Sequence, residues 1–236
     1  MLRTAIVGFV GVLVGAAVVG VGTSQGERPA KLVKAERFEL VDPEGRARVI
    51  LGLAPDGSGG VILMDKDGKG RAGLVLTEAG RPILDLFDEN ENAAAELTLG
   101  DDGSPSLKLR DKNERLRAVF AVMTDGTPWL GLTGEDEKMR LGLVLGEDDN
   151  PSLFLRDNEA NSRLAVGITK DGNPEITLGD DAAEPRAVLM VTPDGRPGLL
   201  LIDEEGNDRA ELGLERDGKP FIEMLNQRGK VTWKAP

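Results

Sequence analysis

The sequence predicts an all-β protein, an array of nine 23-residue β-hairpin repeats that follows an N-terminal transmembrane helix or signal peptide. Three observations support this fold class: a constant repeat period without insertions, alternating apolar residues in every period, and turn residues between the alternating segments. Eight repeats are complete and the ninth ends at Pro236. The repeats begin at Arg37, Gly60, Ile83, Ser106, Trp129, Ser152, Glu175, Gly198 and Phe221.

Each repeat contains two segments with the pattern of a β-strand. Numbering the residues of a repeat from 1 to 23, apolar residues occupy positions 2 and 4 and then positions 13, 15 and 17. In the second repeat these are Val61 and Leu63, followed by Ala72, Leu74 and Leu76. Because side chains of a strand alternate between its faces, this spacing places all five on one face, which we expect to be buried.

Two turns separate the strands. The turn at positions 19 to 21 often has the form of Asp56-Gly57, which suits a three-residue loop with glycine in the left-handed region. The turn at positions 8 and 9 has the form of Asp67-Gly68 in some repeats and predicts a two-residue type I′ turn. Five repeats lack this glycine, and their turns are expected to be built differently; they carry Glu91, Glu114, Glu137, Ala160 and Ala183 instead.

These loops determine a strand register. The first loop pairs position 4 with position 13 and position 2 with position 15, and the second loop pairs position 15 with position 2 of the next repeat. Two successive hairpins therefore advance the chain by one full repeat without a slip, as an antiparallel meander does. A two-sided β-solenoid with one repeat per coil is the alternative, because it buries the same positions with parallel stacking.

A single sheet with one apolar face needs a cover. The sheet must curl on itself, face another sheet or bind a partner. The opposite face is only partly polar, since it carries Glu39 and Lys108 but also Phe154 and Leu200. We therefore expect a curled or self-associating array.

The N-terminal segment has the pattern of a membrane-targeting sequence. Residues 5–22 carry no charge, and Arg3 precedes them. A run of this length is at the short end of what spans a bilayer, and the positive charge keeps the N-terminal end in the cytoplasm. The segment is therefore either an uncleaved anchor or a cleaved signal.

This interpretation divides the chain into residues 1–25, an anchor or signal peptide, residues 26–36, a linker, and residues 37–236, the β-repeat domain. It expects the membrane as a partner through residues 5–22. It places the repeat domain outside the cytoplasm of a bacterial-type cell, held at the inner membrane, or secreted if the segment is cleaved.

The composition excludes several functions. The chain has no Cys, His or Tyr, and 41 acidic residues against 29 basic ones give a net charge of -12. Imidazole- or thiol-based catalysis, imidazole metal sites and zinc knuckles are excluded, and nucleic acid is repelled. Paired carboxylates remain, namely Asp101 with Asp102, Asp148 with Asp149 and Asp180 with Asp181. None stands out from its repeat equivalents, so we expect no enzyme, no cofactor and no small-molecule substrate.

A ladder of charged residues accompanies the repeats. Position 6 is aspartate and position 12 arginine in seven repeats each. The ladder could recognise a charged polymer, but a structural role is the simpler interpretation, since Asp accepts hydrogen bonds from turn amides and Arg pairs with it. The ladder consists of Asp42, Asp65, Asp88, Asp111, Asp157, Asp180, Asp203, Arg48, Arg71, Arg117, Arg140, Arg163, Arg186 and Arg209.

The sequence thus predicts a non-catalytic extracytoplasmic repeat protein that acts as an envelope scaffold, spacer or protein-interaction surface, through self-association or an envelope protein. The alternative is a ligand-binding module for a cation such as calcium or for a polysaccharide. The acidic turns do not match an EF-hand loop, since counting twelve residues from Asp65 reaches Leu76 rather than glutamate. Aromatic residues, the usual platforms for sugars, make up only 3% of the chain.

Overall fold

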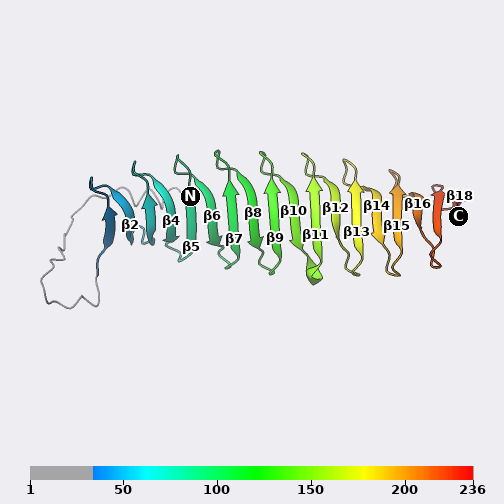
Figure 1. The fold of residues 1–236 in the computed structure, drawn as a ribbon, viewed down its shortest axis with the longest axis horizontal. Coiled ribbons are helices and arrows are strands. Elements are labelled where there is room, and N and C mark those ends of the chain that lie inside the picture. The colour runs from blue at the N-terminus through cyan, green and yellow to red at the C-terminus, as the bar shows by residue number, and fades with distance from the viewer. Residues whose placement is uncertain (1–33, 236) are drawn as a thin grey trace. The chain divides into compact units, whose positions relative to one another are not determined.

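The computed structural model describes residues 34–235, which form two compact units that divide between Asp101 and Asp102. Both units are antiparallel meanders, and the part described contains no α-helix. Neighbouring strands run in alternate directions in each unit (Figure 1). The antiparallel meander is therefore confirmed over the parallel solenoid. The expected membrane segment at residues 5–22 lies outside the described residues.

The first unit holds six strands, each paired with its neighbours along the chain. They are β1 (Arg37–Val41), β2 (Ala47–Leu53), β3 (Gly59–Met64), β4 (Gly70–Leu76), β5 (Pro82–Phe87) and β6 (Ala93–Leu99).

The second unit holds twelve strands in the same arrangement and one 3-10 turn, η1 (Glu147–Asp149). The strands are β7 (Pro105–Arg110), β8 (Leu116–Val122), β9 (Pro128–Thr133), β10 (Met139–Leu145), β11 (Pro151–Arg156), β12 (Ser162–Ile168), β13 (Pro174–Gly179), β14 (Pro185–Val191), β15 (Pro197–Ile202), β16 (Asp208–Leu214), β17 (Pro220–Leu225) and β18 (Val231–Ala235).

The strand register agrees with the sequence arithmetic. In the first hairpin Leu40 pairs with Val49 and Phe38 with Leu51, which joins positions 4 and 13 and positions 2 and 15. The next hairpin pairs Leu51 with Val61, position 2 of the following repeat. Positions 2, 4, 13, 15 and 17 therefore share one face of the sheet in each unit, which we call the leucine face.

The first turn differs from the expected two-residue turn. Asp42 N–H donates to the Arg46 carbonyl and Gly45 N–H to the Asp42 carbonyl, which closes a three-residue loop. Val41 then pairs with Ala47 while Leu40 pairs with Val49, so Arg48 is the extra residue of a β-bulge. A three-residue loop followed by a one-residue bulge gives the same register as a two-residue loop, so the register alone could not distinguish them.

The five turns without glycine are not built differently, contrary to expectation. Their residues at position 9 adopt the same left-handed backbone, with φ between 59° and 77°, at Glu91, Glu114, Glu137, Ala160 and Ala183. The hydrogen bonds of these loops match those of the glycine loops, as Ala183 N–H donating to the Asp180 carbonyl shows. The common hairpin geometry prevails over the local cost of a side chain at positive φ.

The buried side chains lie on the other face, which we call the mixed face and which carries positions 1, 3, 5, 14 and 16. Ile50 and Ile62 are 2% and 3% exposed, and Val75 packs with them. Glycines make this burial possible in a single layer: a Cβ at Gly73 would lie 3.0 Å from Ile62 Cδ1. Large side chains lie flat over glycines, and the expectation that the leucine face is the buried one is wrong for the described residues.

Gly142 gives the sharpest test of this packing. Its Cβ would lie 2.0 Å from Cζ of Phe154, whereas a Cβ at Gly198 would approach no atom closer than 4.0 Å. Gly142→Ala should lower the free energy of unfolding by about 1–3 kcal/mol through overpacking. Gly198→Ala, the control, should change it by less than ~1 kcal/mol. Urea denaturation measures both, and equal effects would contradict the packing of Phe154 over Gly142.

The left-handed residues give a second test. Ala183→Gly removes a Cβ at φ 65° and should stabilise the fold by about 1 kcal/mol. Gly206→Ala, at φ 81° in the equivalent turn of the next repeat, should destabilise it by a similar amount. Thermal unfolding of the two variants checks the opposite signs, and a destabilising Ala183→Gly would contradict the shared turn geometry.

Candidate functional site: an exposed leucine face and a charged ladder

The seven ladder aspartates lie in the first turn of their repeats, where each carboxylate binds backbone amides of the loop. Oδ1 of Asp65 accepts hydrogen bonds from the amides of Asp67 and Lys69, at 2.9 and 3.0 Å. The same pair of bonds, from the residues two and four positions on, recurs at the other six ladder aspartates. Asn226 replaces aspartate in the last repeat and accepts the same two bonds. These carboxylates organise the loop that they begin.

The ladder arginines connect consecutive repeats. Each ladder arginine is the bulge residue of its hairpin, which turns its side chain toward the loop. Nη1 of Arg209 lies 3.2 Å from Oδ2 of Asp203 in its own repeat, and its Nε donates over 3.0 Å to the Leu225 carbonyl in the next. Arg163 makes the same two contacts with Asp157 and Gly179.

Glutamates at position 9 make another contact between repeats. Glu91 Oε1 accepts a hydrogen bond of 3.0 Å from the Gly70 amide, and Glu137 Oε1 one of 3.1 Å from the Leu116 amide. Both amides belong to the preceding repeat and lie beside its bulge. A carboxylate that satisfies such an amide offsets part of the cost of a left-handed glutamate.

These contacts stabilise the charged form of the aspartates. The side-chain hydrogen bond from Arg115 is the largest cause that lowers the pKa of Asp111, from 3.8 to about 2, with loop amides adding to it against desolvation. At Asp65, Asp88 and Asp203 the amide four residues on is the largest cause of a lowered pKa. Desolvation is the largest contribution at Asp42, Asp157 and Asp180, but amide and arginine hydrogen bonds outweigh it and their pKa is lowered too.

The three pairs of adjacent carboxylates lie in three different turns. Asp102 accepts the Ser104 amide, Asp101 pairs with Arg81 at 3.0 Å, and Asp180 belongs to the ladder. Asp148 and Asp149 follow Gly146 in the η1 turn, both at positive φ. Among residues 34–235, no group of three or more acidic residues has the arrangement of a metal site.

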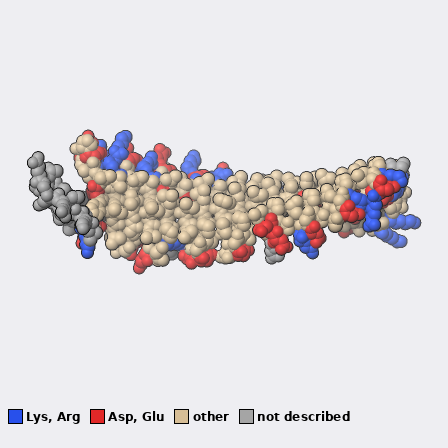
Figure 2. All heavy atoms as spheres, turned by 60° about the horizontal axis from the view of Figure 1, so that its bottom comes forward, with Lys and Arg blue, Asp and Glu red and all other residues tan. Residues whose placement is uncertain are grey.

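The leucine face is the prominent surface of the described chain. Nearly all exposed large apolar side chains belong to it, Val41, Met123 and Val231 being the exceptions. Positions 2, 4, 13, 15 and 17 carry no charged or hydrogen-bonding side chain except the indole of Trp233. Figure 2 shows one face of the molecule, on which charged side chains gather along the borders and the surface between them is largely uncharged. Monomers rarely expose apolar patches of more than a few hundred Å².

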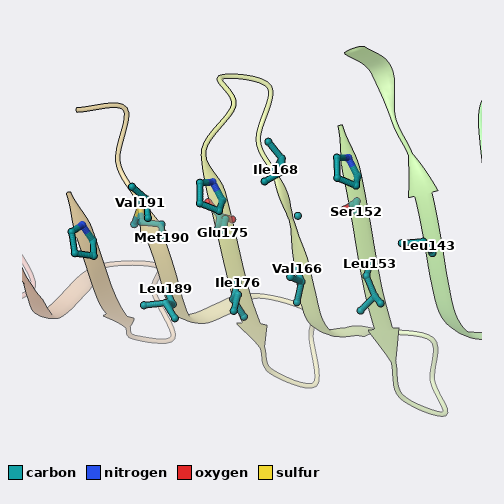
Figure 3. Close-up of a pocket in the computed structure, with 14 residues that line it drawn as sticks. Leu143, Ser152, Leu153, Val166, Ile168, Glu175, Ile176, Leu189, Met190 and Val191 are labelled. Carbon is teal, nitrogen blue, oxygen red and sulfur yellow. The ribbon is translucent and has the colours of Figure 1, made fainter. Parts of the chain in front are cut away.

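A groove of about 520 Å³ crosses the leucine face in the second unit. Its lining is apolar and comes from strands β10 to β15, with Leu143, Val166 and Leu189 at position 15 of three successive repeats. Figure 3 shows Leu153, Val166, Ile176 and Leu189 in a row across neighbouring strands. The groove was not predicted from the sequence. One feature of the sequence does indicate it, because Val166 is shorter than the residues at position 15 of the other repeats, apart from Ala235.

The described residues contain no helix long and apolar enough to cross a membrane. The proposed anchor at residues 5–22 lies outside them, as does most of the linker at residues 26–36.

Comparisons with known proteins gave structural neighbours alone. No family model and no curated protein sequence matches the chain. The TCP10 domain of Danio rerio CPAP, in complex with a STIL peptide, is 14% identical, covers 84% of this chain and 98% of its own, and has a TM-score of 0.35. The Drosophila melanogaster SAS-4 TCP domain, in complex with a proline-rich motif of Ana2, is 11% identical, covers 69% and 88%, and has a TM-score of 0.40. Similarity this low says nothing about what this chain binds.

The ladder predicts a pH dependence. Because the folded-state pKa of these aspartates is lowered, their contribution to stability is present above the unfolded value near 4 and is lost as pH falls toward about 2. The melting temperature should therefore fall between pH 4 and pH 2. Thermal unfolding monitored by circular dichroism measures it.

Asp111 variants separate its two roles. Asp111→Asn keeps an acceptor for the loop amides, as Asn226 does, but loses the charge opposite Arg115 and Arg117. Asp111→Ala loses both and should lower the free energy of unfolding more than the asparagine variant does. Both should show a smaller acid-induced loss than the unmodified chain, and an unchanged loss would contradict the assignment.

Proposed function

We propose that this chain is a non-catalytic extracytoplasmic β-repeat protein, an envelope scaffold or spacer whose leucine face is a protein-interaction surface. The observation that carries the proposal is the leucine face itself, which is exposed in both units and continues from repeat to repeat without a charge. Exposed apolar area of this extent costs free energy in water, and covering it is the main source of favourable free energy in protein association.

In this proposal the charged ladder has a structural role, because it holds the loops and links successive repeats. The ladder aspartates already bind loop amides, and six of them also lie within 4 Å of the bulge arginine of their own repeat. Arg71 and Arg186 extend to the carbonyls of Asp88 and Asp203 in the next repeat. A carboxylate engaged in this way has little capacity left for calcium or for catalysis, and the geometry recurs from repeat to repeat without a distinct centre.

The location outside the cytoplasm rests on the sequence. The uncharged run at residues 5–22 follows Arg3, and this order of charge and apolar segment directs the following chain across a membrane.

A charge on the leucine face tests the proposal. Leu143 on β10 is 45% exposed, and Leu143→Lys should leave the free energy of unfolding within about 0.5 kcal/mol because its side chain reaches solvent. Retention of any protein partner, this chain included, should fall at least tenfold, since a lysine must then be desolvated at the interface. Pull-down with the full-length chain from envelope extract, followed by urea denaturation of the same variant, provides both measurements.

Gln227→Lys is the matched control, because it adds the same charge in an exposed turn between β17 and β18. It should retain partners as the unmodified chain does. Equal retention by Leu143→Lys and Gln227→Lys would mean that the leucine face is not the interaction surface.

A further inference from the structure

We propose that the partner of the leucine face is a second copy of this chain, packed face to face about a twofold axis at Leu143. This inference rests on the proposed function, since it names the occupant of the same surface. Four features of the described residues support it: matching periodicity, charge distribution, area, and complementary side chains on the two sides of Leu143.

The periodicity of the face suits an identical partner. Equivalent side chains recur at every second strand, one repeat apart in the sequence, so the face has regularly spaced rows of leucines. Only a surface with the same spacing can keep its rows in register with these rows along many strands, and a second copy has that spacing by identity. Two sheets packed in this way lie about 10 Å apart with their strands within about 30° of each other.

The distribution of charge permits this packing despite a net charge of -12 for each copy. The ladder carboxylates lie in the turns that border the sheet, where Oδ1 and Oδ2 of Asp203 already bind loop amides and Arg209. Charged groups at the border stay hydrated when two central surfaces meet, and salt screens them. A dry apolar centre inside a polar border is the ordinary anatomy of a protein interface.

The available area is sufficient. An axis at Leu143 on β10 pairs the seven strands β7 to β13 with the same seven strands of the second copy. Strands of about six residues, each about 20 Å long and about 4.8 Å from the next, give these seven strands a face of roughly 670 Å² per copy, or about 1,300 Å² in total. This total lies within the range of about 1,200–2,000 Å² that specific interfaces bury.

Position 15 supplies the register of the two copies. This row contains one residue larger than leucine and one smaller branched residue, Phe120 and Val166, and they flank Leu143 at equal distances of one repeat. Phe120 is 55% exposed, and Val166 lines the groove between Leu153 and Ile176. Figure 3 shows Val166 on the strand between those of Leu153 and Ile176, and all three residues line this groove.

A twofold axis parallel to the strands at Leu143 brings these features together. The axis reverses the order of repeats in the second copy but preserves the height of each position along the strand. Phe120 of each copy then faces the groove at Val166 of the other, and Leu143 faces itself. Because the interface is isologous, the complementary contact forms twice.

Site-specific cross-linking tests this arrangement, and the absence of cysteine from the chain makes single-cysteine variants unambiguous. Leu143→Cys and Leu189→Cys are matched, since both occupy position 15 and are 45% and 49% exposed. In membranes from cells that express the full-length chain, a short bismaleimide should link Leu143→Cys to its copy in most molecules. Leu189→Cys should give at least tenfold less covalent dimer, because its equivalent in the second copy lies far from it.

A mixture of two variants checks the complementary contact. Phe120→Cys and Val166→Cys should each give little covalent dimer alone and a strong one when expressed together. An association driven by the apolar residues 5–22 does not produce this selectivity, since it has no preference for position 143 over position 189.

Three results overturn the inference. Equal cross-linking at positions 143 and 189 would show that identical repeats face each other, which requires a different axis. Cross-linking at neither position, with partner retention still abolished by Leu143→Lys, would leave the proposed interaction surface standing with a different protein as its occupant. Cross-linking at neither position, with Leu143→Lys also without effect on retention, would refute both the second copy and the proposed function.

Discussion

The fold depends on one constraint, that two successive hairpins must advance the chain by one full repeat. The first hairpin achieves this with a three-residue loop and a bulge, and the second with a three-residue loop alone. A slip of one residue in either hairpin would move every following leucine to the other face. The aspartate at position 6 closes the bulged loop, and the bulge points an arginine toward that aspartate and toward the next repeat. The strand register, the loop geometry and the contacts between repeats therefore depend on one another.

The two faces of the sheet differ in how far their apolar side chains are buried. On the mixed face, large side chains lie over glycines, so that Ile50 and Ile62 are buried although no second layer covers them. On the leucine face, positions 2, 4, 13, 15 and 17 carry no glycine, and many of their large side chains remain exposed. No glycine gap is present on this face for a neighbouring side chain to fold over. In the proposed dimer, a second copy with the same spacing covers this face.

Charge and apolar surface occupy different parts of the molecule. Carboxylates are confined largely to loops, where amides and arginines lower their pKa, as at Asp111. The sheet thereby keeps a high negative charge, which favours solubility, without interrupting the apolar face. The exceptions lie on the mixed face, where Glu211 and Glu223 are cross-strand partners and burial, together with the Glu223 charge, raises the pKa of Glu211.

The sequence by itself determined the strands and, for an antiparallel meander, their register, because alternation and a period without gaps permit few arrangements. It left the parallel solenoid open, and only the strand pairing of the structure decided against it. It also placed the aspartates in turns. The tertiary structure decided three features that the alternation of apolar residues does not predict: the buried face, the loop type and the groove. Which face is buried depends on glycines opposite Phe154 and Ile62, and a pattern of apolar residues does not show which neighbour covers which. The loop type was ambiguous because a loop with a bulge and a shorter loop give equal registers. The groove at Val166 appeared only once three successive repeats lay side by side, since a cavity is a relation between neighbours.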